Sequence, residues 1–117
     1  MINYHEQIVE ALEKILPTHY EMVLHSGIET PCLSYMELGN VAADEGDTLG
    51  YSRLTFQIKV WGTDLGVIQE YALQVDEALR ALGFKRISSG EMYDQNSAMI
   101  QKIMSFEALA KEDFKKE

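Results

Sequence analysis

One stretch of the sequence decides the fold: Arg53-Leu54-Thr55-Phe56-Gln57-Ile58-Lys59-Val60-Trp61. Apolar and polar residues alternate along it, which is the period of a strand with one buried face. The apolar set points to the core, and Arg53, Thr55, Gln57 and Lys59 point to the opposite face of the sheet. Trp61 shares this second face, where a large aromatic ring is partly exposed unless something else covers it.

A helix with clear signals at both ends follows this strand. Gly62 turns the chain, Thr63 or Asp64 caps the helix, and Gly83 supplies the left-handed residue that ends it. A broad apolar stripe lies between them at helical spacing: Ile68, Tyr71, Ala72, Val75, Ala78, Leu79 and Leu82. We therefore expect the helix to seal the apolar face of the strand, which leaves the opposite face free to meet other molecules.

The N-terminal third predicts a helix and two strands. Asn3 can cap an amphipathic helix, with Glu6 completing a capping box, and Pro17 ends it. Residues 19–24 alternate in polarity and predict a first strand. A second strand runs from about Cys32 to Leu38, just after a proline that a strand tolerates at its start.

The segment from Gly39 to Gly50 has no periodicity and is predicted to be a loop, the tip of a long hairpin. It carries three carboxylates, on Asp44, Glu45 and Asp47. The residue order of a calcium-binding loop is absent, so we interpret it as a solvated acidic loop. Loops of this length without structure of their own tend to be functional or mobile.

The C-terminal third predicts a hairpin. Residues 84–93 form one strand, interrupted at Ser88-Ser89-Gly90, and residues 98–108 form the last strand. Residues 110–117 are predicted to be a frayed, charged tail. The fold class is α+β: a single domain over residues 1–117, with a mixed or mainly antiparallel sheet of four to five strands and two helices packed on it.

The composition excludes some classes of protein but does not indicate a particular reaction. The chain has 117 residues, 46% of them hydrophobic, which suits one globular core. Its formal charge of −9 disfavours direct binding to nucleic acid. A single cysteine, Cys32, excludes an internal disulfide and suits a reducing cytoplasm. No signal peptide and no uncharged stretch of membrane-spanning length is present, so no membrane partner is expected.

No arrangement of residues indicates catalysis. The histidines His5, His19 and His25 lack a metal-ligand spacing. There is also no nucleophile elbow, phosphate-binding glycine loop or paired cysteine motif. We therefore predict no catalytic residue, no cofactor and no metal. The row Arg53 to Lys59 with Trp61 has two interpretations: a solvated sheet face, or a subunit interface in which Trp61 is an anchor.

The order of the predicted elements, with the strand-tryptophan-turn-helix segment Leu54 to Leu82 and the closing strand Ile100 to Leu109, resembles a known family. The chain is similar to the tail terminator or tail completion proteins, also called head-tail joining proteins, of long-tailed phages and prophages. The resemblance implies small α+β subunits that assemble as hexameric rings. Such a ring caps the finished tail tube, stops its polymerisation and presents a surface to the head connector.

The same resemblance implies the partners and the location. These are sister copies in a ring, the tail-tube protein and the head connector or stopper protein, in a virion made in the host bacterial cytoplasm, at the head-proximal end of the tail. DNA is only cargo passing through the lumen, which suits the acidity of the hairpin around Val41 to Leu49. The interface residues predicted are Asp44, Glu45, Asp47, Arg53, Thr55, Gln57, Lys59 and Trp61. Alternatives are a minor tail or connector component of similar fold, or a small-molecule-binding or enzymatic α+β domain.

Overall fold

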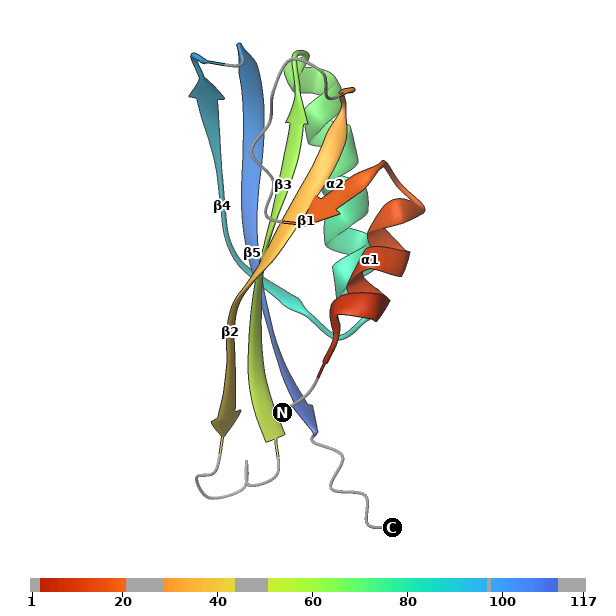
Figure 1. Cartoon of the computed structure of the whole chain (residues 1–117), viewed down its shortest axis with the longest axis vertical. Coiled ribbons are helices and arrows are strands. Elements are labelled where there is room, and N and C mark those ends of the chain that lie inside the picture. Colours follow the sequence, from red (N-terminus) through yellow and green to blue (C-terminus); the bar gives the residue numbers. More distant parts are fainter. Residues whose placement is uncertain (1–2, 21–28, 44–50, 97, 112–117) are drawn as a thin grey trace.

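The computed structural model describes residues 3–20, 29–43, 51–96 and 98–111. These residues form two helices and five strands, shown in Figure 1. The elements in chain order are α1 (His5–Glu13), β1 (Thr18–Tyr20), β2 (Cys32–Ala43), β3 (Tyr51–Gly62), α2 (Leu65–Ala81), β4 (Lys85–Asp94) and β5 (Met99–Lys111).

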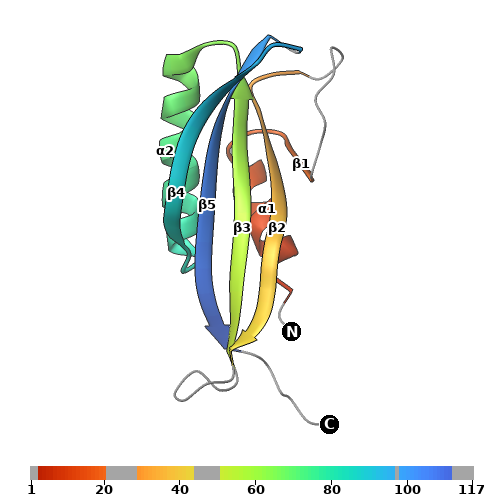
Figure 2. The ribbon, with the colours of Figure 1, turned by 90° about the vertical axis from the view of Figure 1, so that its left-hand side faces the viewer.

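The five strands make one sheet in the order β1-β2-β3-β5-β4. The short strand β1 runs parallel to β2, and every other neighbouring pair is antiparallel. Figure 2 looks onto the sheet with the four long strands side by side and both helices behind them. The predicted α+β class, the mixed sheet and the two helices packed on it are confirmed. No helix in the described part of the chain is long and apolar enough to cross a membrane.

The strand-helix unit that the sequence predicts is the centre of the core. Leu54, Phe56, Ile58 and Val60 of β3 are fully buried, and so are Ile68, Val75 and Leu79 of α2, in the same cluster. Burying a side chain of this size contributes about 1.5–3 kcal/mol. The helix therefore seals the apolar face of β3, as predicted.

Helix α2 has the predicted ends. The Asp64 carboxylate oxygen Oδ1 accepts a hydrogen bond from the Val67 backbone N–H at 3.2 Å. This bond satisfies one of the backbone donors that every helix leaves free in its first turn. Gly83 follows the helix with φ +96°, the left-handed conformation that an L side chain strains.

The Gly83 position gives a first prediction. Replacement of Gly83 by alanine should lower the free energy of unfolding by about 1–2 kcal/mol, because the new Cβ forces a strained left-handed residue. Urea denaturation followed by circular dichroism measures it. Gly90→Ala is the matched control, since that strand glycine has no positive φ and its added Cβ meets nothing within 4 Å. Equal stability of the G83A variant and the wild type would contradict the prediction.

Helix α1 is anchored differently from the prediction. The helix begins after Tyr4, which makes no side-chain capping bond, and the Asn3 side chain instead accepts from the His5 N–H at 3.0 Å. The predicted capping box with Glu6 is therefore wrong. The helix is held to the sheet by His5, whose Nε2 lies 2.8 Å from the Glu37 carboxylate and whose ring packs against Phe56 at 5.4 Å.

Two strands are longer or more regular than predicted. Strand β2 continues to Ala43, so the loop prediction is wrong for residues 39–43, which pair with residues 51–55 of β3. Strand β4 runs unbroken through Ser88, Ser89 and Gly90, and the irregularity there is a register shift between Arg86 and Ser88. Backbone pairing to a neighbouring strand overrides the weak strand propensity of glycine, alanine and serine.

Strand β1 covers residues 18–20, and the rest of the predicted first strand, residues 21–24, lies outside the described residues. The predicted hairpin of β4 and β5 is confirmed by their antiparallel pairing. Strand β5 extends to Lys111, within the stretch predicted to fray, and residues 112–117 lie outside the described part.

Candidate assembly surface

In the described part of the chain both helices lie on one face of the sheet, and we call the other the helix-free face (Figure 2). The alternation of β3 places Arg53, Thr55, Gln57, Lys59 and Trp61 on it, opposite the buried apolar set. The structure thus brings together the predicted interface residues of β3 in one row. The other three, Asp44, Glu45 and Asp47, lie outside the described residues.

The charged members of this row have partners within the chain. The Arg53 guanidinium pairs with the Glu107 carboxylate of β5 at 3.0 Å, and both side chains are partly exposed. The Lys59 ammonium lies 5.6 Å from the centre of the Trp61 ring, within the range of a cation–π contact. Thr55 and Gln57 lie between Arg53 and Lys59 on β3 and are partly buried. The row is therefore polar but close to charge-balanced.

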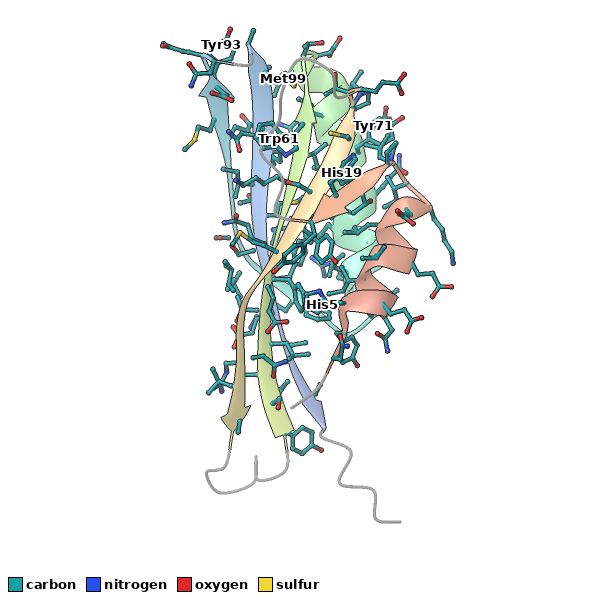
Figure 3. All side chains as sticks on the ribbon, in the orientation of Figure 1. His5, His19, Trp61, Tyr71, Tyr93 and Met99 are labelled. Atoms are coloured by element: carbon teal, nitrogen blue, oxygen red, sulfur yellow. The ribbon has the colours of Figure 1, made fainter. Side chains whose placement is uncertain are left out.

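Trp61 is far more buried than its position on this face suggests. Only 5% of its surface is exposed, and it forms a small cluster with Cys32 of β2 and Met99 of β5. Its indole N–H donates to the Ser34 hydroxyl at 2.9 Å. Figure 3 shows Trp61 and Met99 at the same end of the sheet. Trp61 thus ties β2, β3 and β5 together, and little of its ring is available to a partner.

The Trp61–Ser34 bond gives a second prediction. Ser34→Ala should lower the free energy of unfolding by about 1–2 kcal/mol, because the buried indole N–H then has no acceptor. Since Trp61 is the single tryptophan, its fluorescence in a urea titration reports the change directly. Ser105→Ala, a partly buried serine of β5 on the same face, is the control and should change stability much less. Equal losses for the two serines would contradict the assignment.

Cys32 is fully buried beside Trp61 and acts as a small apolar residue. Burial raises the pKa of its thiol to about 11. At pH 8 roughly one thiol in a thousand is then ionised, and the thiolate is the reactive form. We predict that a thiol reagent such as Ellman's reagent will not label the folded protein at pH 8 but will label it in urea. Rapid labelling of the folded chain would contradict this prediction.

Sequence reasoning missed the apolar residues of the helix-free face. Val41 of β2 and Leu109 of β5 both pair with Arg53, one on each side, and their exposed fractions are 60% and 46%. Partly buried Met36 and Ile103 lie on the same face further along the sheet. Val41 was assigned to a loop, so only the extension of β2 shows that it belongs to this row.

The described residues leave the two edge regions of the sheet without a strand neighbour along part of their length. In the described part of the chain no strand pairs with the outer side of β4, and β1 covers β2 only at residues 33–35. Strand β4 is fixed to α2 by Arg86, which donates to the Asp76 carboxylate at 2.7 Å, and by Glu91, which accepts from Gln69 at 2.8 Å. These contacts fix β4 to α2. Residues 85–93 of the strand are all exposed.

The described residues include no group of three or more metal-ligating side chains. A groove of about 500 Å³ lies between the two helices, where Lys14 of α1 and Glu77 of α2 flank apolar residues such as Ile15 and Leu82. No group in this groove is placed as a nucleophile beside a base.

Comparison with known proteins gives a likeness of fold. No protein-family model matches the sequence. No curated protein matches it either. Among solved structures, the chain is similar to a chain in the virion of a native gene transfer agent particle, with a TM-score of 0.59 and 16% sequence identity. The match covers 89% of this chain and 84% of that chain, so it extends over nearly the whole fold.

Proposed function

We propose that this chain is a structural virion protein of a phage or prophage, which caps the tail tube as a ring and joins the tail to the head connector. Its partners are sister copies, the tail-tube protein and the connector, and DNA passes through the ring as cargo. The protein acts by complementary shape and strand edges, without bond chemistry. A capping ring needs head-to-tail contacts between copies and two unlike faces for its two partners.

The observation that carries this proposal is the fold shared with a virion chain over 89% of the length of this one. The physical features agree with assembly. Among the described residues the outer side of β4 has no strand neighbour, and exposed apolar side chains flank a paired arginine on the helix-free face. The net charge of −9 also suits a ring through which DNA must slide without being held.

Native mass spectrometry of the protein alone, and then electron microscopy of mixtures with the tail-tube protein of the same phage or prophage, test the proposal. We expect rings at one end of each tube and tubes of defined length. A protein that forms no ring alone and binds no tube end would contradict it. A minor tail or connector component would instead bind away from the tube end, which a gold-labelled chain distinguishes in the same micrographs.

A further inference from the structure

We propose that the free protein forms a two-fold symmetric dimer, in which the outer side of β4 pairs with β4 of a second copy. The occupant of this edge is thus the same strand, running in the opposite direction. A two-fold contact closes after two copies, so the dimer goes beyond the proposed ring and does not build it. Two-fold dimers are also the commonest assemblies of soluble proteins.

The outer side of β4 is available to another strand. Every residue from 85 to 93 is exposed, and in the described part of the chain the only strand that pairs with β4 is β5, on its other side. Unpaired backbone groups along an edge are a template for pairing, and soluble proteins usually protect them with prolines or charges. Between Arg86 and Tyr93 there is no proline and one charged side chain, Glu91, which is neutralised by Lys102 at 3.2 Å.

The side-chain faces of β4 restrict the register of this pairing. Residues directly opposite each other in an antiparallel pair lie on the same face of the sheet. Ser88, Gly90 and Met92 lie on the helix-free face, whereas Ser89 and Glu91 lie on the face that carries the helices. A two-fold axis through Gly90, perpendicular to the sheet, keeps like faces together. It places Ser88 opposite Met92 of the second copy, and Ser89 opposite Glu91.

The register shift around Ile87 lets the same pairing continue to both ends of the strand. Because Ile87 is the extra residue, Arg86 lies opposite Tyr93 of the second copy and Lys85 lies opposite Asp94, again with like faces together. This axis therefore occupies all ten residues of β4. The basic residues at the start of the strand meet the aromatic and acidic residues at its end, so the strand is complementary in charge to its own copy.

A large exposed side chain of α2 lies beside the same axis. Gln69 of α2 binds Glu91 at 2.8 Å, and Asp76 binds Arg86 at 2.7 Å. Leu73 lies between Gln69 and Asp76 on the same side of the helix, so it is level with the middle of β4, where both line a hollow of about 190 Å³. Figure 2 shows α2 behind this edge of the sheet. The dimer brings the two copies of Leu73, each 69% exposed in the single chain, toward each other across the axis.

A cysteine at the axis tests the contact. In Gly90→Cys the two new Cβ atoms would lie about 4.5–5.5 Å apart, close enough for a disulfide or a short bis-maleimide. The variant should fold, because a Cβ at this position meets nothing within 4 Å in the single chain. We expect oxidation with diamide to give a covalent dimer on a denaturing gel. Ser88→Cys is the matched control and should give little dimer, because its two thiols would lie four residues apart along the contact, about 13 Å.

A charge exchange at Ser88 and Met92 gives a second readout. The two residues are four positions apart on one strand, about 13 Å, so charges on them interact little within a chain. In the dimer each lies directly opposite the other, and this pair occurs twice. Ser88→Lys/Met92→Lys should therefore have a dimer dissociation constant about tenfold higher than Ser88→Lys/Met92→Glu, because like charges directly opposite each other destabilise a strand pair. Sedimentation equilibrium measures both constants.

Sedimentation of the wild-type protein without tail tubes completes the test. A dimer that G90C links, and that opposite charges hold more tightly than like charges, would support the inference. A protein that stays monomeric at high concentration, or charge variants with equal dissociation constants, would overturn it and leave the proposed function standing. Dimers or rings that form without the 90–90 link would also overturn it. A linked dimer from a chain that binds no tube end would support the inference and contradict the capping function.

Discussion

Phe56→Ala should lower the free energy of unfolding by about 3–5 kcal/mol, the typical cost of emptying a buried phenylalanine site. Phe56 is fully buried at the centre of the sheet. Its ring packs edge-on against Phe84 at 5.8 Å and against His5 at 5.4 Å, and it stacks with Tyr35 at 6.5 Å. One truncation therefore removes contacts that join α1, β2, β3 and Phe84, the residue before β4.

The expected loss is a large share of the total, because domains of this size are stable by only about 5–15 kcal/mol. Urea denaturation at neutral pH measures it through the midpoint and the slope of the transition. Tyr93→Ala is the matched control, since that aromatic ring is largely exposed on β4 and its loss should change stability by about 0.5 kcal/mol or less. A loss below about 1 kcal/mol for F56A would mean that the core is not organised around this ring.

The sequence was sufficient to predict the unit of β3 and α2, because the signals that define it come from residues close together in the chain. The alternation from Leu54 to Val60 has one period, and Asp64 and Gly83 mark the helix ends by chemistry that needs no distant partner. Local signals were also enough to predict the hairpin of β4 and β5. What they left open was the position of β5 between β3 and β4, which depends on long-range pairing.

The errors in the strands share one cause, which is dependence on a cross-strand neighbour. Residues 39–43 contain glycine, asparagine and alanine, and they form a strand because residues 51–55 pair with them. Trp61 was expected to be partly exposed because its position on the strand gives only its face. Its burial follows from Cys32 and Met99, which the register places beside it. The sequence therefore predicts the part of the candidate surface that lies on β3. It does not predict that the apolar side chains of Val41 and Leu109 flank this part.

Those flanking residues carry the prediction with the largest effect on assembly. Leu109→Asp should reduce ring assembly on tail tubes about 30-fold, the effect of losing about 2 kcal/mol, which is the cost of removing a side chain that anchors an interface. Leu109 is 46% exposed. It pairs with Arg53 on one side of β3, and Val41 pairs with Arg53 on the other side. The new carboxylate would have to be desolvated wherever a partner covers this row. The variant should fold, because exposed substitutions usually change stability by about 0.5 kcal/mol or less.

Leu73→Asp is the control for this change. Leu73 is 69% exposed on α2, on the side of the molecule away from the helix-free face, and the substitution adds the same charge. Counting capped tubes by electron microscopy at several protein concentrations gives the ratio between the two variants. If the helix-free face meets a partner, L109D loses capping and L73D retains it, because only the first places a charge in the contact. Equal loss would show that net charge matters and not this surface. Full capping activity of L109D would show that the partner does not contact the surface formed by Val41, Arg53 and Leu109.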